Sequence, residues 1–149
     1  MSEKKKLTAR QYLEQLETID TKINQHLERL AEMKADATST GGFDYSRERV
    51  QTSTSGDKLC KDVARYVDFN AQINAEIDQF VDAKNQIISE IQGLNVNNYI
   101  QVLFKRYVQF KNLKVTASEM KMSYQYVRDL HKKALEMFGE TYTNLHYLT

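Results

Sequence analysis

Residues 112–138 read NLKVTASEMKMSYQYVRDLHKKALEMF, and two short helical patterns meet within them at the turn-sized break 121–123. At about 100° per residue, the second pattern places its apolar side chains in one arc and a set of polar side chains opposite them. The apolar arc holds Val127, Leu130, Ala134 and Phe138, and the polar arc holds Gln125, Arg128 and Lys132. The pattern predicts a helix-turn-helix whose second helix, 123–138, packs through one face and presents the other outward.

The outward face of that helix carries side chains suited to DNA. In a helix-turn-helix, the first turns of the second helix enter the major groove and contact base edges. Arg128 suits a bidentate bond to guanine, Gln125 suits adenine, and Tyr124 suits a phosphate or a thymine methyl group. The flanking lysines would lie near phosphates, and Asp129 would either pair with one of them or accept a hydrogen bond from cytosine. The predicted DNA-binding residues are Lys121, Tyr124, Gln125, Arg128, Asp129, Lys132 and Lys133.

Two motifs in this region carry a family resemblance. SYQYVRDLHKKAL at 123–135 is similar to the recognition helix in the fourth region of bacterial sigma factors, and LFKRY at 103–107 is similar to the helix before it. Together with VQTS at 50–53, they resemble small sigma-region-4-like proteins of Gram-positive phages and prophages, in the style of the RinA and ArpU late-gene transcriptional regulators. The resemblance spans roughly residues 45–138 and implies promoter binding, with RNA polymerase as a further partner. At Lys121 the family usually has Gly, Asn or Asp, so the turn is expected to be wider or distorted here.

Charge is distributed unevenly along the 149 residues, whose formal net charge is +1. Residues 57–90 contain four basic and seven acidic side chains, whereas 105–133 contain eight basic and two acidic ones. A basic face supplies the sequence-independent attraction for phosphates in nucleic-acid binding. Charge alone fits a solvated helical surface equally well, so the motif rather than the charge selects double-stranded DNA as the partner.

Two long apolar repeats in the N-terminal part predict a rod. Apolar residues recur at alternating three- and four-residue steps over 7–33, and the same repeat continues for four heptads over 57–92. Gly93 follows the second repeat in the place of a helix C-cap. We therefore expect an all-α chain in which 1–93 form a long antiparallel helical hairpin, a coiled-coil-like rod, with a connector at about 35–56.

The surface of this rod suggests two partners other than DNA. Asn70 and Lys84 both fall on the apolar seam, where a polar residue fixes register and partner number. Because the apolar stripe is wider than one hairpin contact needs, a homodimer through the rod is one hypothesis. The alternative function is a helical interaction module that binds a phage or host protein through the rod.

The chain after the rod is expected to form the small C-terminal helix-turn-helix head, at 94–138. Apolar side chains at helical spacing in 100–107 predict a helix that leads into the motif. The first motif helix is expected to begin at the Asn112 cap, in preference to a shorter helix begun by a capping box of Thr116 and Glu119, and Ser123 is expected to cap the second motif helix. Gly139 is expected to end the second motif helix, which leaves 139–149 as a tail whose packing the sequence does not decide.

Composition and motif content exclude several classes of protein. No run approaches the ~18 apolar residues of a membrane span and the start lacks an apolar signal segment, so the cytoplasm of a bacterial host is expected. The single cysteine, Cys60, can form no intramolecular disulfide. The sequence has no phosphate-binding glycine loop, no Cys or His pair at ligand spacing and no nucleophile beside a base. We therefore expect no enzymatic activity, cofactor, metal site or membrane contact.

Overall fold

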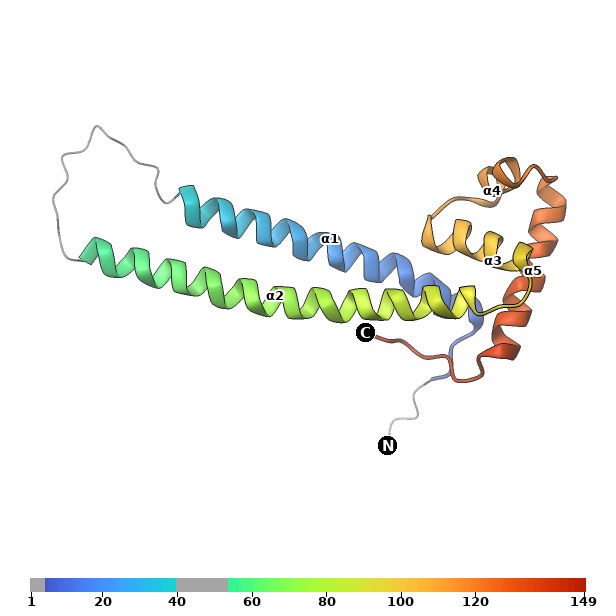
Figure 1. The fold of residues 1–149 in the computed structure, drawn as a ribbon, viewed down its shortest axis with the longest axis horizontal. Helices are drawn as coiled ribbons and strands as arrows, with labels where there is room; N and C mark the ends of the chain where they lie inside the picture. The colour runs from blue at the N-terminus through green and yellow to red at the C-terminus, as the bar shows by residue number, and fades with distance from the viewer. Residues whose placement is uncertain (1–4, 40–53) are drawn as a thin grey trace. The chain divides into compact units, whose positions relative to one another are not determined.

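A computed structural model describes residues 5–39 and 54–149, in which every regular element is a helix. The elements are α1 (Ala9–Ser39), α2 (Thr54–Gln92), α3 (Asn97–Leu103), the π-helix η1 (Phe104–Val108), α4 (Leu113–Met120) and α5 (Tyr124–Thr141) (Figure 1). The all-α class expected from the sequence is therefore confirmed. Within the described ranges, no helix combines the length and the apolar character needed to cross a membrane.

The two long helices extend into the connector that the sequence predicted at 35–56. α1 continues to Ser39, and α2 already begins at Thr54. The centre of that connector, the VQTS motif at 50–53 and the side chain of Cys60 lie outside the described residues.

The chain divides into two compact units, residues 1–21 with 80–149 (the first unit) and residues 22–79 (the second unit). In the second unit, His26 Nε2 of α1 lies 2.6 Å from Glu76 Oε2 of α2. This hydrogen bond from His26 lowers the pKa of the Glu76 carboxyl group. The contact gives His26 of α1 a polar partner on α2.

In the first unit, α1 and α2 run antiparallel. The ammonium group of Lys84 donates to Asp20 Oδ1 at 2.9 Å, and the hydroxyl of Tyr12 donates to the Glu90 carboxylate. The later residue of α1 thus pairs with the earlier residue of α2. Lys84, a polar residue on the predicted apolar seam, is accommodated there because its charge meets a carboxylate.

The core of the first unit is built from one face of each of its longer helices. Its fully buried large side chains are Tyr12, Leu13, Leu16, Ile19, Ile87, Ile91, Val102, Leu103, Thr116, Val127 and Phe138. The ring of Phe138 connects two others, with centroids 5.8 Å from Tyr12 and 4.9 Å from Tyr142. Tilted aromatic pairs at such separations stabilise a core beyond their buried area.

The helix predicted over 100–107 changes its pitch midway. α3 continues directly into η1, where the Gln109 N–H donates to the Phe104 carbonyl at 3.0 Å, a bond that spans five residues. Such π-helical turns are rare and often mark functional sites. The chain then leaves the helix through Phe110, at a positive φ of 55°. Tyr107, within η1, is almost completely buried.

α2 ends at Gln92, directly before Gly93, but the glycine does not form a left-handed cap. Its φ is not positive, and a Cβ at this position would lie only 2.6 Å from the Tyr142 hydroxyl oxygen. That hydroxyl donates to the Glu90 carbonyl at 2.7 Å and so satisfies one of the carbonyls that a helix end leaves unpaired. A side chain at position 93 would therefore have to displace the Tyr142 hydroxyl.

The prediction that Gly139 ends the last helix is wrong, because α5 continues through it to Thr141. A Cβ at Gly139 would lie 3.8 Å from the Ala9 Cβ, an ordinary contact. Neither backbone geometry nor space therefore requires a glycine at this position. Helical hydrogen bonding carries on until Tyr142 leaves the helical conformation.

The tail after α5 packs along the start of α1 (Figure 1). The Leu7 N–H donates to the Leu145 carbonyl at 2.9 Å, and Leu145 is buried. The buried amide of Gln15 accepts from the Leu148 N–H at 2.9 Å and donates to the His146 carbonyl at 3.4 Å. The tail, which the sequence left undecided, is therefore part of the first unit.

We expect Gly93→Ala to lower the free energy of unfolding by on the order of 1 to 3 kcal/mol, because the added methyl group must displace the Tyr142 hydroxyl. In a Tyr142→Phe background the same change should cost much less, since the obstructing oxygen is gone. Chemical denaturation of the four proteins measures this cycle. An equal cost in both backgrounds would show that Tyr142 does not set the constraint.

Candidate nucleic-acid interface

A tight turn of three residues, 121–123, joins α4 to α5. Lys121 adopts the left-handed conformation, with φ 55° and ψ 43°. Its N–H bonds the carbonyls of Ala117 and Ser118, and the Met122 N–H donates to the Ala117 carbonyl at 3.0 Å. Of the two expected outcomes at Lys121, the wider turn is not found, and the strain lies in the left-handed backbone of the lysine itself. The lysine takes the backbone geometry suited to Gly or Asn, at a cost of about 1 kcal/mol.

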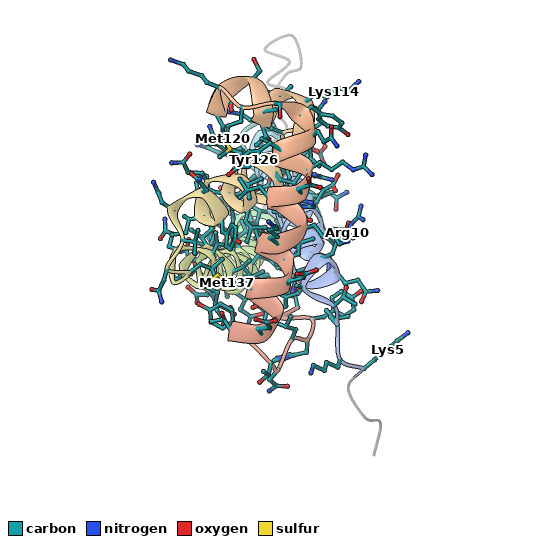
Figure 2. The ribbon with its side chains drawn as sticks, turned by 90° about the vertical axis from the view of Figure 1, so that its right-hand side faces the viewer. Lys5, Arg10, Lys114, Met120, Tyr126 and Met137 are labelled. Atoms are coloured by element: carbon teal, nitrogen blue, oxygen red, sulfur yellow. The ribbon has the colours of Figure 1, made fainter. Side chains whose placement is uncertain are left out.

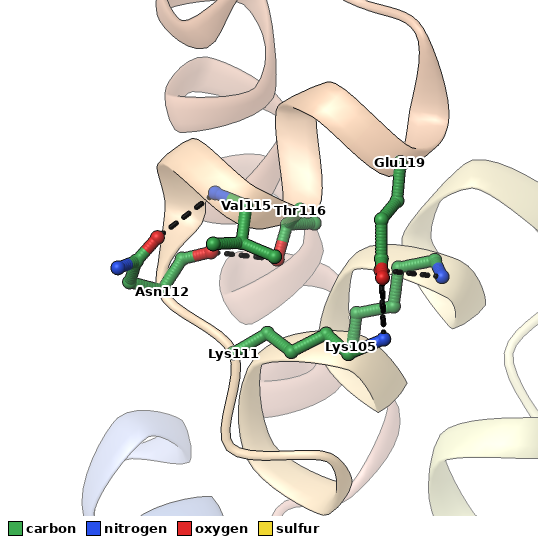
Figure 3. Close-up of polar contacts among 6 residues, drawn as sticks. All are labelled: Lys105, Lys111, Asn112, Val115, Thr116 and Glu119. Atoms are coloured by element: carbon green, nitrogen blue, oxygen red, sulfur yellow. Dashed lines mark hydrogen bonds and ion pairs between the residues drawn. The ribbon is translucent and has the colours of Figure 1, made fainter.

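Both helices begin at the caps that the sequence predicted. Asn112 Oδ1 accepts from the Val115 N–H at 2.8 Å, and Ser123 Oγ accepts from the Tyr126 N–H at 3.2 Å. Thr116, a buried polar residue of α4, donates its hydroxyl to the Asn112 carbonyl at 2.9 Å (Figure 3). A buried hydroxyl with a partner avoids the desolvation penalty of an unpaired one, so a threonine is tolerated there.

Glu119 of α4 ties this helix to the segment before it. Its carboxylate accepts from Lys111 at 2.6 and 2.8 Å and from Lys105 at 3.0 Å (Figure 3). The bonds from Lys111 and Lys105 lower the pKa of the Glu119 carboxyl group. Two of the eight basic side chains counted in 105–133 are thus engaged in holding α4, and they contribute less to any anion-binding surface.

α5 buries the apolar face predicted for it. The side chains covered are Val127, Leu130, Ala134 and Phe138. All seven residues predicted to bind DNA are exposed. The predicted outward face was defined by Gln125, Arg128 and Lys132. These three side chains therefore project together from an accessible surface.

An open groove of about 730 Å³ runs along this surface. Four predicted residues of α5 line it, namely Tyr124, Arg128, Asp129 and Lys132, whereas Gln125, Lys121 and Lys133 lie outside its lining. Its other lining residues are Arg10, Arg106, Asn112, Leu113, Lys114, His131 and Leu135. The groove thus has five Lys or Arg side chains and one carboxylate, and among the described residues Asp129 makes no ion pair with a lysine.

The sequence did not predict the cationic residues on the wall of the groove opposite α5, which are Arg10, Arg106 and Lys114. Figure 2 shows Arg10 and Lys114 along the same side of α5, opposite the side that carries the labels of Met120 and Met137. Lys114 and Arg106 belong to the basic stretch 105–133, so the excess of basic residues there was the one feature of the sequence that could have indicated them. Arg10 lies more than a hundred positions before α5, and no local pattern connects the two.

His131 anchors α5 to η1 at the edge of this groove. Its ring stacks on Tyr107 with centroids 5.6 Å apart, and its Nε2 lies 2.8 Å from the Tyr107 hydroxyl. Burial, with smaller contributions from Arg106 and Arg10, lowers the pKa of His131 to about 4, and burial raises the pKa of Tyr107 to about 12. The neutral ring accepts a hydrogen bond from the phenol at neutral pH. His131 therefore serves packing and adds no charge to the groove.

We expect acid to destabilise the protein through His131. Its pKa in the folded state is below the ordinary value near 6.5, so the unfolded chain binds the proton first and stability falls between about pH 6.5 and about pH 4. His131→Asn should reduce the loss of unfolding free energy over this interval by on the order of 1 to 3 kcal/mol. Urea unfolding at both ends of the interval measures it, and an NMR titration of His131 near 6.5 would contradict the assignment.

The comparisons and the described residues identify no further chemistry at this site. Within the described ranges, no group of three or more His, Cys, Asp or Glu side chains could hold a metal ion. No protein-family model, curated protein or solved structure matches this chain. The features of this site that bear on function are the two faces of α5 and the cationic groove beside it.

Proposed function

We propose that this protein is a sequence-specific DNA-binding regulator of transcription, in which α4 and α5 form a helix-turn-helix and α5 reads the major groove. The observation that carries the proposal is the division of α5 into two faces, with Gln125, Arg128 and Lys132 exposed opposite the buried apolar residues. The groove beside them has five cationic side chains and one carboxylate. A surface of that charge supplies the attraction for phosphates on which DNA binding depends.

The dimensions of α5 suit this role. A helix with its side chains is about 10 to 12 Å across, and the major groove of DNA is about 12 Å wide. Arg128 and Gln125 lie in the first two turns, where recognition helices contact bases. Arg128 would bond guanine and Gln125 adenine, while Lys121, Lys132 and Lys133 would approach phosphates.

Asp129 favours base contact over a structural role. A carboxylate among phosphates is repelled unless it meets a donor, and no lysine among the described residues pairs with Asp129. The exocyclic amine of cytosine is such a donor in the major groove. We therefore favour the second of its two predicted roles, in which Asp129 specifies a cytosine.

The resemblance to the fourth region of sigma factors extends the proposal to phage or prophage promoters, with RNA polymerase as a further partner. On this reading α1 and α2 form the antiparallel, coiled-coil-like hairpin that supports the head. The contacts that favour the hairpin are Lys84 with Asp20 in the first unit and His26 with Glu76 in the second.

A second candidate function, protein interaction through the rod, is favoured by exposed apolar side chains in the second unit. Leu27, Val63, Val67 and Phe69 are each between 42% and 56% exposed. Scattered apolar residues are common on surfaces, but four within one small helical unit suit a protein partner or a second copy of the chain. This function is compatible with DNA binding by the head.

We expect Arg128→Ala to weaken binding to the protein's DNA target by on the order of 1 to 3 kcal/mol and to relax preference at one base pair. Lys132→Ala should weaken binding to target and random DNA alike and flatten the dependence on salt. A target selected from a random library, followed by fluorescence anisotropy at several salt concentrations, measures both effects. Lys61→Ala, an exposed charge-matched change on α2, is the control and should alter neither.

Two outcomes of that experiment would count against the proposal. If Arg128→Ala lost affinity equally for target and random DNA, Arg128 would contact phosphate and not a base. If the wild-type protein selected no sequence and bound no duplex at low salt, DNA would not be its partner, and the interaction module would become the first candidate.

We expect a homodimer formed through the second unit to separate when charge is placed on its apolar surface. Val67→Asp together with Leu27→Asp should shift the protein from dimer to monomer in sedimentation velocity at micromolar concentration, because burying carboxylates at a contact is unfavourable. Gln79→Asp together with Gln25→Asp, which adds the same two charges at exposed polar positions of the same unit, is the control. A wild-type protein that is purely monomeric would exclude the homodimer.

A further inference from the structure

The groove beside α5 has a second cationic wall that comes from outside α4 and α5. Arg106 projects from η1 and Arg10 from the first turn of α1, and both line the groove with Arg128 and Lys132 of α5. Positive side chains from elements far apart in the sequence therefore converge on one open cleft. Such convergence is more specific than a basic stripe along a single helix.

Arg106 is the more constrained of the two arginines. It is half-buried, and its guanidinium carbon lies 5.2 Å from the centroid of the Tyr107 ring. The Tyr107 ring in turn stacks on His131, so the guanidinium is supported by a packed column. Among the described residues Arg106 has no carboxylate within 4.0 Å. Glu14 and Glu17 line a second cavity beside Arg106, but neither carboxylate pairs with it, so the guanidinium can bond an added anion directly.

Arg10 is free to move toward the same ligand. Its side chain is 63% exposed, and its Nε donates to Glu14 Oε1 at 3.0 Å. An exposed pair of this kind, four residues apart on a helix, contributes little to stability and is easily exchanged for another acceptor. The charges of Arg10 and Arg106 both help to lower the pKa of His131, a residue that lines the groove, so their electric field extends into the groove.

We propose that Arg106 and Arg10 together bind one backbone phosphate of DNA, so that the first turn of α1 belongs to the DNA interface. This inference rests on the proposed function, with α5 in the major groove. A phosphate diester has one negative charge and two free oxygens, which two guanidinium forks can bond directly. Such a contact has no sequence preference of its own and fixes where α5 lies along the duplex.

The test compares variants of both arginines on selected and random DNA. Arg10→Ala and Arg106→Gln should each weaken binding about tenfold on both DNAs and reduce the slope of log affinity against log salt by about 1. Arg106→Lys should keep the slope and lose part of the affinity, because the charge remains but the fork is lost. Glu14→Gln should tighten binding by freeing Arg10.

Matched controls separate this site from general charge. Arg65→Ala removes an exposed arginine of α2 that does not line the groove, and it should leave affinity and slope unchanged. Thermal unfolding reports whether Arg106→Gln disturbs its packing on Tyr107. If it does, Arg10→Ala and Glu14→Gln, which alter exposed side chains, carry the test.

Three results would overturn the inference. Wild-type affinity and slope in Arg10→Ala and Arg106→Gln would remove the phosphate contact and leave DNA reading by Arg128 intact. Binding of inorganic pyrophosphate that both arginine variants abolish, with no change in DNA affinity, would assign the groove to a free phosphate ligand. Absence of any DNA binding by the wild type would overturn the proposed function and this inference together.

Discussion

Burial of one face of α5 is the constraint on which the rest of the first unit depends. Each large apolar side chain removed from water contributes about 1.5 to 3 kcal/mol, and Val127, Leu130 and Phe138 are almost completely covered. Because side chains rotate by about 100° per residue, fixing these positions also fixes the direction of the opposite face. The exposure of Gln125, Arg128 and Lys132 is therefore a consequence of core packing.

Polar contacts then hold the irregular segments around this helix. Tyr107 bonds His131 from η1, Gln15 bonds the tail, and the Tyr142 hydroxyl closes the end of α2. Among the described residues, no buried side-chain nitrogen or oxygen lacks a hydrogen-bond partner. Since an unpaired buried polar group costs about 1 to 3 kcal/mol, these bonds specify one arrangement of segments that have no regular ladder of their own.

Features encoded locally could be predicted from the sequence, and features that depend on distant neighbours could not. The helical class, the buried face of α5 and the caps at Asn112 and Ser123 follow from periodicity and from side chains acting within a few residues. Gly93 was placed correctly at a helix end, yet its reason is the oxygen of Tyr142, which is far away in sequence. The π-helical turn and the role of Arg10 likewise depend on tertiary packing, which no local pattern encodes.

The arrangement of acidic residues bears on whether the positive charge of the head is functional. A basic surface that only keeps a helix solvated would be expected to have carboxylates interspersed among its cations. In the first unit the carboxylate of Glu119 instead engages the two lysines that hold α4, and Glu14 engages Arg10. The remaining groove cations face one another across a cleft whose only carboxylate is Asp129. Mutual repulsion of that kind is relieved by an anion, so the charge pattern favours a phosphate ligand over simple solvation.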